Sequence, residues 1–292
     1  MRIATRTRDH RGAGPVLPEL LVDPDWLGDH LGDPRVRIVD LRDREAYGEA
    51  HISGAVRLDL EDLGERRDGC DNAVLRPADF ERLMARLGIS DRDTVVAYDD
   101  HWGLPSARLI WALHHYGVRS VGVLNGGWDR WREEGRGTTG AQSPEGPALE
   151  PEGPPLERED GPPLEPADRF EAHLSPDVAA DHEWIADRVG REGIVFLDTR
   201  SNTEFDQGHL PGAIAWDWFN AVPAESWESS RDSEELRSEL ARLGVHPSDE
   251  VVVYCQSGMR AAHTYVVLRH AGFPRVRLYD GSWQEWTMET PK

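Results

Sequence analysis

The chain alternates between short runs of apolar, often β-branched residues and longer segments in which apolar residues recur at helical spacing. The helical segment after 251–254 covers 261–269 and ends before Gly272 and Pro274. Strands that alternate with helices predict βαβ units, and therefore a mainly parallel sheet with helices on both faces. We interpret the following short runs as buried strands: 36–41, 95–98, 121–124, 194–199, 251–254 and 276–279.

The hydrophobic pattern occurs twice along the chain. Shifting the sequence by 158 positions superposes identical residues, and later segments match at shifts of 156 and 155, as expected for small insertions and deletions. The pattern therefore predicts an α/β fold made of two tandem domains. The identities at the shift of 158 are Trp26 with Trp184, Asp40 with Asp198, Arg42 with Arg200, His51 with His209, Gly54 with Gly212 and Ala55 with Ala213.

We place the first domain at residues 16–135 and the second at 169–292. Residues 136–168 between them hold eight prolines, many glutamates and almost no apolar periodicity. Such a composition favours extended, polyproline-like conformations, so we expect a semi-rigid linker on the surface. A proline-rich recognition motif is the alternative interpretation.

Charge and composition restrict the partners. The formal net charge of −21 argues against nucleic acid and anionic membranes, which need a basic face. The only lysine is Lys292, so the many arginines reflect a compositional preference and are not evidence of anion binding.

The N-terminal residues 1–14 lack the apolar core of a secretory signal, and no apolar stretch approaches the roughly 18 residues of a membrane span. Two cysteines, Cys70 and Cys255, are too few for a disulfide scaffold and fit a reducing compartment, although they could pair with each other. We therefore expect a cytoplasmic protein, with a short transit segment as the alternative.

Cys255 stands where a predicted strand ends and a predicted helix is about to begin. At such a junction, unpaired N–H groups and the positive end of the helix dipole favour an anion, such as a thiolate. Ligands of parallel sheets bind outside the carboxyl ends of the strands, which is where this residue lies. We expect Cys255 to be a nucleophile; the alternative is an inert buried cysteine. The expected loop continues through Gln256, Ser257, Gly258, Met259 and Arg260.

The first copy has Asp99 where the second has Cys255. A carboxylate cannot carry a sulfur atom and would repel an anion, so we expect the first domain to be inactive. A metal site at Asp99, Asp100 and His101 is an alternative, but a solvated turn also accounts for these residues, and a metal site needs further ligands. The sequence predicts no metal ion and no cofactor.

Several motifs resemble the tandem-domain rhodanese family of sulfurtransferases. The segment from Phe205 to Ala213 is similar to the N-terminal signature of the family, and residues 47–55 match it with serine in place of proline. Residues 276–286 resemble the C-terminal signature, and a six-residue loop from Cys255 to Arg260 lies between the two. The resemblance implies two rhodanese-like domains, of which only the second is catalytic. It also implies that the first domain forms one wall of the cleft.

Within these motifs, His209 could be interpreted as a base. We prefer a structural role, because a thiolate that its loop already ionises needs no base, and because His51 recurs in the copy without cysteine.

The chemistry expected from this resemblance is a two-stage transfer of a sulfane sulfur through a persulfide on Cys255. We expect thiosulfate as the donor, because a dianion gains more from an added positive charge than a monoanion does. The alternative donor is 3-mercaptopyruvate, since Ser257 and Gly258 resemble the loop of the enzymes that use it. Cyanide or a thiol, including a protein thiol, would accept the sulfur.

Two arginines are candidates for binding the donor. Arg260 closes the loop with a planar guanidinium suited to oxyanions, and Arg200 follows a strand at the expected mouth of the cleft. For Arg200 the alternative is a salt bridge with Asp198 or Glu204, because Arg42 recurs in the inactive copy. Gln256, Ser257, Gly258 and Met259 would add hydrogen-bond donors from the loop.

Two further classes of protein compete with this interpretation. Phosphatases also close a cysteine loop with an arginine, but they resemble Cys-x5-Arg, whereas four residues separate Cys255 from Arg260. A non-catalytic rhodanese-like binding module would not need the cysteine loop that the second copy retains.

Overall fold

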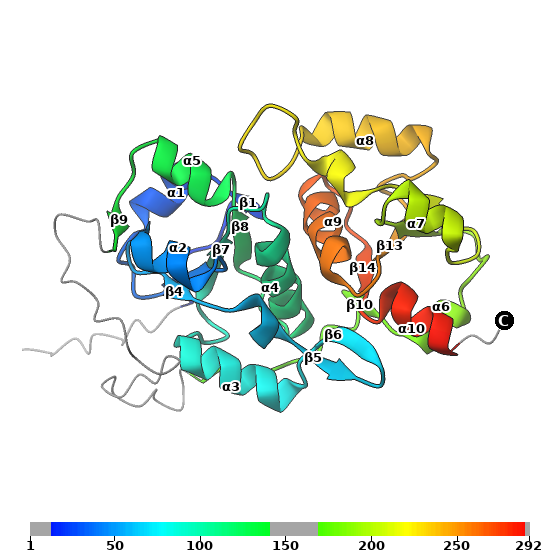
Figure 1. Ribbon diagram of the computed structural model, residues 1–292, viewed down its shortest axis with the longest axis horizontal. Coiled ribbons are helices and arrows are strands. Elements are labelled where there is room, and N and C mark those ends of the chain that lie inside the picture. Colours follow the sequence, from blue (N-terminus) through cyan, green and yellow to red (C-terminus); the bar gives the residue numbers. More distant parts are fainter. Residues whose placement is uncertain (1–12, 141–168, 290–292) are drawn as a thin grey trace, which may run out of the picture.

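The computed structural model describes residues 13–140 and 169–289. Its elements form two α/β units that lie side by side (Figure 1). The first unit is built around five parallel strands, in the spatial order β1 (Leu21–Val22), β8 (Val121–Leu124), β7 (Thr94–Tyr98), β2 (Val36–Asp40) and β4 (Val56–Arg57). Its helices are α1 (Pro24–Asp29), α2 (Arg44–Glu49), α3 (Pro77–Leu87), α4 (Leu104–His115) and α5 (Gly127–Glu133), with a 3-10 turn η1 (Leu60–Leu63).

The second unit repeats this topology. Its five parallel strands are β10 (Ala179–Ala180), β14 (Val276–Tyr279), β13 (Glu250–Tyr254), β11 (Ile194–Asp198) and β12 (Ile214–Ala215), again in spatial order. Its helices are α6 (His182–Ala186), α7 (Asn202–Gln207), α8 (Ser233–Arg242), α9 (Met259–His270) and α10 (Ser282–Glu289), with a 3-10 turn η3 (Trp218–Ala221). The expected parallel sheets are confirmed, and the strand ends differ from the predicted ranges by one residue at most.

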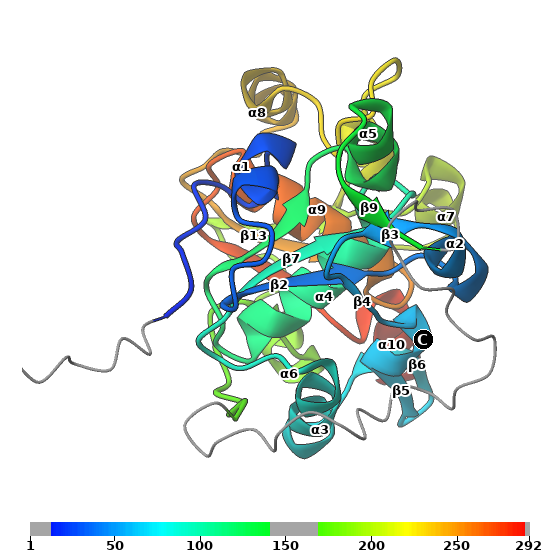
Figure 2. The ribbon, with the colours of Figure 1, turned by 90° about the vertical axis from the view of Figure 1, so that its left-hand side faces the viewer.

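Helices cover both faces of each sheet. Successive side chains of a strand point to opposite faces, and because the strands are apolar at most positions, both faces must be covered from water. Figure 2 shows α1 and α5 on one side of the first sheet and α3 and α4 on the other. In β13, Val251 and Val253 belong to the core under α9, whereas Val252 and Tyr254 belong to the core under α6 and α10. This alternation places Cys255, the next residue, on the side of α9.

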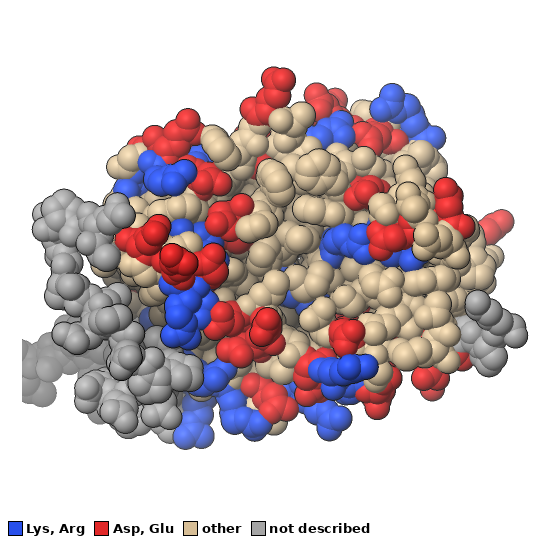
Figure 3. Space-filling view, in the orientation of Figure 1, with Lys and Arg blue, Asp and Glu red and all other residues tan. Residues whose placement is uncertain are grey.

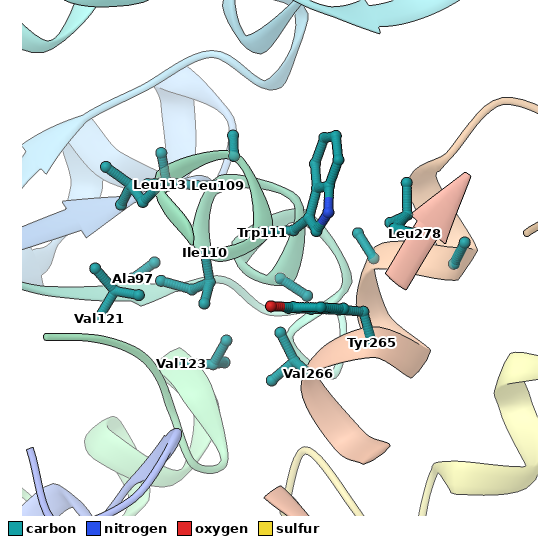
Figure 4. Packing of buried hydrophobic residues seen from close by; sticks show 14 of the residues in the cluster. Ala97, Leu109, Ile110, Trp111, Leu113, Val121, Val123, Tyr265, Val266 and Leu278 are labelled. Carbon is teal, nitrogen blue, oxygen red and sulfur yellow. The ribbon is translucent and has the colours of Figure 1, made fainter. Parts of the chain in front are cut away.

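The inner faces of the two units share one hydrophobic core. Helices α4 and α9 pack against each other in the middle of the molecule (Figure 1). Figure 4 shows Trp111 and Ile110 of α4 near Tyr265 and Val266 of α9. The Tyr265 hydroxyl lies 3.1 Å from Nδ1 of His114, so a polar contact also joins the two helices. The units are therefore held together by a buried apolar interface.

The first residues of the expected linker, 136–140, contact the first unit. Strand β9 (Thr138–Thr139) pairs with β3 (His51–Ile52), and Arg136 forms an ion pair of 2.6 Å with Asp25, so residues 136–140 belong to the first unit. At the start of the second described range, Phe170 is buried and its ring contacts Phe80 of the first unit. Removing this ring from water stabilises the contact. The proline-rich core of the expected linker, residues 141–168, lies outside the described residues.

A hairpin extends from the first unit toward the second. Strand β5 (Gly64–Arg67) pairs antiparallel with β6 (Cys70–Val74), and the two strands lie beside α10 in Figure 1. Asp68 and Asn72 have positive φ angles of 51° and 59°, a conformation that asparagine and aspartate tolerate better than most residues. We call residues 64–74 the hairpin below.

The surface is mixed in charge. On the face shown in Figure 3, basic side chains lie next to acidic ones, and the area between the units is largely uncharged. Among residues 13–140 and 169–289, no helix is long and apolar enough to cross a membrane. A cytoplasmic location stays a prediction.

Candidate functional site

Cys255 begins the loop between β13 and α9 and is 1% exposed. Its backbone is held from both sides: its N–H donates to Oγ of Ser282 at 3.1 Å, and its carbonyl accepts from the N–H of Trp283 at 3.0 Å. The turn that begins α10 therefore fixes the position of the thiol relative to the sheet. Cys255 and Cys70 are both free.

Gly258 is the residue before α9 and has a φ of +83°. A side chain there would be strained, and its Cβ would lie 3.0 Å from Nη1 of Arg108 and 3.1 Å from the carbonyl of Asp280. Glycine lets the loop turn sharply against these groups. The first N–H groups of α9 have no intrahelical partner and surround the end of the loop.

The remaining residues of the loop are Gln256, Ser257 and Met259. The carbonyl of Gln256 accepts from the N–H of Gln284 at 3.1 Å, while its side chain is exposed. Ser257 is partly buried, and Met259 is the first residue of α9. The backbone contact anchors the loop, while the side chain of Gln256 faces solvent.

Arg260 forms a bidentate ion pair with Glu204 of α7, with distances of 2.7 and 2.8 Å from Nη1 and Nη2 to the two carboxylate oxygens. The side chains are 25% and 33% exposed, so the pair lies at the surface of the site. The hydrogen bond to Arg260 is the main reason that the pKa of Glu204 falls to about 2. The pKa of Arg260 is raised mainly by its hydrogen bond to Glu204 and, to a smaller extent, by its interaction with Cys255, against the effect of burial.

Glu204 is a residue that the sequence did not assign to Arg260. Its position in α7 follows from a capping box, in which the Ser201 side chain accepts from the N–H of Glu204 and the Glu204 side chain accepts from the N–H of Ser201. A serine followed three residues later by glutamate was the available signal, but it identifies a helix start and not an ion pair across the fold.

Arg200, which we expected to bind the donor, contacts groups of its own unit in this structure. Its guanidinium is buried, donates to both oxygens of Asp198 at 2.6 to 3.2 Å, and donates to the carbonyl of Gly208 at 2.7 Å. It also stacks on Trp283, 4.7 Å from the ring centroid. The alternative interpretation, an ion pair with Asp198, describes what is observed.

The first unit contains the same arrangement without a cysteine. Arg42 is buried, donates to both oxygens of Asp40 and to the carbonyl of Ala50, and stacks on Trp128 at 3.9 Å. Tyr98 donates to Asp40 from the neighbouring strand. Because the arrangement recurs where no sulfur chemistry is expected, we assign it to the fold.

Asp99 is not the solvated residue of a turn that the sequence suggested. It is buried, and its carboxylate accepts from the N–H groups of His101 at 2.7 Å, Gly103 at 2.9 Å and Ser106 at 3.0 Å, and from the Ser106 hydroxyl. Burial raises its pKa, and these hydrogen bonds lower it. Both oxygens are engaged, which leaves Asp99 unsuited to a metal ion. The loop of the first unit thus holds a carboxyl group that belongs to the chain itself.

The hairpin of the first unit reaches the cysteine loop of the second. The side-chain amide of Asn72 donates to Oγ of Ser257 at 3.3 Å, and the N–H of Val74 donates to Asp280 at 2.8 Å. Arg108 of α4 supports both contacts, because it pairs with Asp280 at 2.7 Å and donates to the carbonyl of Asn72. These residues were not predicted, since nothing in the local pattern connects positions so far apart.

His209 stacks on Phe205 with ring centroids 3.8 Å apart, and its Nδ1 lies 2.9 Å from the carbonyl of Phe205. His51 and Tyr47 repeat both contacts in the first unit. This geometry agrees with the structural role that we preferred for His209.

Comparisons with known proteins agree with the repeat. The model of the rhodanese-like domain matches residues 23–134 and again 181–289. A thiosulfate sulfurtransferase of Corynebacterium glutamicum is 35% identical, over 92% of this chain and 88% of that protein. The sulfur carrier protein TtuD of Thermus thermophilus is 32% identical, over 92% and 94%. The crystal structure of SseA from Escherichia coli, described among 3-mercaptopyruvate sulfotransferases, has a TM-score of 0.73 at 25% identity and covers 91% of this chain and 99% of that one.

Proposed function

Because the chain belongs to the rhodanese-like family and is a sulfurtransferase with two such domains, we propose that Cys255 carries the transferred sulfur. The Cys255 thiolate attacks the outer sulfur of the donor and forms a new S–S bond. The bond between that sulfur and the rest of the donor breaks, and the leaving group keeps its electron pair. An acceptor nucleophile then removes the sulfur and restores the thiolate.

The observation that carries this proposal is the carboxyl group held at the corresponding place in the first unit. Two N–H groups of the loop and one from the first turn of α4 converge there on Asp99. The Cys255 loop has the same position after the central strand and ends in a glycine of the same conformation, with a φ of +83° for Gly258 and +80° for Gly103. We infer that the N–H groups of this second loop stabilise the thiolate, and later the persulfide, in the same way.

Arg260 is the residue that we propose for binding the donor. Two of its five N–H groups are used by Glu204, and a further hydrogen bond links the guanidinium to Cys255, so the N–H groups that remain face the thiol side of the site and can bind an oxyanion. Arg200 is no longer part of the proposed site, since its guanidinium is committed to Asp198 and Gly208. Gln256, Ser257, Gly258 and Met259 complete the proposed site through their backbone and side-chain donors.

We propose thiosulfate as the donor, in which case sulfite is the leaving group. Its support is the planar set of N–H donors that Arg260 presents at the end of the loop, together with the relatives that are thiosulfate sulfurtransferases. 3-Mercaptopyruvate is the alternative, which the likeness to SseA favours. Cyanide, a small thiol or a protein thiol would be the acceptor, and the relative that is a sulfur carrier protein supports a protein acceptor.

The phosphatase and the non-catalytic binding module are set aside, because the relatives are sulfurtransferases over most of the chain. The first unit, with Asp99 in the loop, is proposed to be inactive and to contribute the hairpin wall of the site.

Mass spectrometry of the intact protein after incubation with thiosulfate tests the proposal. We expect a gain of about 32 Da, the mass of one sulfur atom, located on Cys255 and removed by cyanide. Cys255→Ser should abolish both the gain and the turnover.

Cys70→Ser is the matched control and should retain both. Cys70 is buried, and its burial together with Glu285 and Asp280 raises the pKa of its thiol, which keeps it protonated. A mass gain that follows Cys70 and not Cys255 would refute the proposed mechanism.

A further inference from the structure

The Glu204 and Arg260 pair occurs only in the unit that has the cysteine. The first unit has Ala46 at the position of Glu204, since each lies three residues after the cap of its helix. It has Pro105 at the position of Arg260, since each lies two residues after the glycine that precedes α4 or α9. The capping of α2 by Asp43 shows that this helix start does not require a glutamate. The first unit therefore forms this helix start without a glutamate, so the capping box that Glu204 completes in α7 is not by itself a reason for a glutamate at this position.

The charge of Glu204 opposes the proposed role of Arg260. Its pKa of about 2 keeps the carboxylate ionised in neutral solution, so the pair has no net charge. A donor that approaches Arg260 meets the N–H groups that Glu204 does not use, but also a fixed negative charge on the Glu204 side chain.

We propose that Glu204 is a specificity-determining residue, which lowers the affinity of the site for dianionic donors relative to monoanionic ones. This inference rests on the proposed function of Cys255 and Arg260. Glu204 holds the guanidinium in a fixed orientation through two hydrogen bonds and at the same time offsets its charge. The site then selects donors by hydrogen-bond geometry more than by total charge.

Coulomb's law sets the expected size of the effect. At low salt, one carboxylate about 7 Å from a bound monoanion weakens binding by about 2.7-fold in a water-like dielectric. For a dianion the same carboxylate weakens binding by about the square of this factor, roughly sevenfold. Thiosulfate should therefore be affected about 2.5 times as strongly as 3-mercaptopyruvate, and added salt should reduce the difference.

Glu204→Gln removes the negative charge of this side chain and leaves its size almost unchanged, so it tests the effect of the charge on donor binding. Glutamine preserves the capping box and can still accept a hydrogen bond from Arg260. We expect KM to fall about sevenfold for thiosulfate and about threefold for 3-mercaptopyruvate at low ionic strength, with kcat changed less than twofold. Glu204→Ala is the second variant, and the alanine of the first unit indicates that this helix tolerates it.

Glu134→Gln is the matched control. Glu134 is also paired with arginines, Arg130 and Arg136, is 32% exposed, and lies in the first unit at the end of α5. Its replacement should leave both KM values unchanged. Equal changes for the two donors in Glu204→Gln, or weaker use of thiosulfate, would overturn the inference.

A binding measurement separates this inference from the proposed function. Titration calorimetry of thiosulfate into Cys255→Ser, with and without Glu204→Gln, measures affinity without turnover. Tighter binding in the double variant supports the role of Glu204 even if the wild type transfers no sulfur. Unchanged affinity overturns it even if the wild type is active.

Discussion

Replacement of Arg200 by methionine should destabilise the protein and leave donor binding intact. Methionine retains much of the side-chain volume but removes the charge that faces Asp198, a residue with no exposed surface. Breaking a buried ion pair by removing one partner costs about 3–5 kcal/mol. Asp198 still accepts from the backbone N–H of position 200, which places the expected value at the lower end of this range.

Two smaller losses add to this cost. The carbonyl of Gly208 loses a hydrogen bond, which is worth about 1 kcal/mol. The stacking of the guanidinium on Trp283 is worth about 1 kcal/mol more. We therefore expect a total loss of about 5 kcal/mol, a large part of the 5–15 kcal/mol that stabilises a typical domain.

Urea unfolding followed by tryptophan fluorescence measures this loss. Arg42→Met is the internal comparison, since Arg42 makes the same contacts in the first unit and should cost a similar amount. Replacing Asp198 by asparagine together with Arg200→Met should recover part of the stability, because no buried charge is then left unpaired. An Arg200→Met protein as stable as the wild type, with a raised KM for the donor, would refute the reasoning.

Two further predictions concern groups buried at the interface and in the first loop. Asp99→Ala should lower the free energy of unfolding by about 2–4 kcal/mol, because three N–H groups lose their acceptor. Sulfur transfer by Cys255 should persist in this variant. Loss of turnover in a folded variant would contradict the structural role that we assign to Asp99. Burial lowers the pKa of His263 from 6.5 to about 4, so below pH 6.5 the unfolded chain takes up a proton that the folded protein does not. The free energy of unfolding should therefore fall as the pH drops from about 6.5 to about 4. His263→Gln should reduce the slope of unfolding free energy against pH by up to about 1.4 kcal/mol per pH unit. Urea unfolding at several pH values measures this slope.

The strands and the cysteine loop could be predicted because their signals are local. A β-branched run such as 251–254, followed by helical spacing, indicates both a buried strand and the place where the chain leaves the sheet. The internal repeat then identified Asp99 as the counterpart of Cys255. Both inferences needed only residue types and spacing.

The partner of each arginine could not be predicted in the same way. The chain has 54 acidic residues, and Glu204 was considered for Arg200 when it actually binds Arg260. Spacing along the chain does not determine which carboxylate lies nearest to which guanidinium after folding. The informative signal for Arg200 was that Arg42 occupies the same position in the first copy. The two copies share their fold but not the cysteine, so a residue present in both indicates a structural role.

The hairpin also lay beyond local pattern. Its residues show no clear apolar alternation, and its contacts with Ser257 and Asp280 join positions about two hundred residues apart. Such contacts follow from the packing of α4 on α9, which brings the two units together only after both have formed.

The hairpin gives the first unit a reason to be retained in evolution. A duplicated domain that has lost its nucleophile is usually free to drift or to be deleted. Here Asn72 and Arg108 of that copy bear directly on the loop of the other, and α4 covers apolar side chains of α9 that water would otherwise reach. Selection on the cysteine loop therefore acts on both halves of the gene, and the second unit on its own would lack the contact of Asn72 with Ser257 and the cover of α4 over its core.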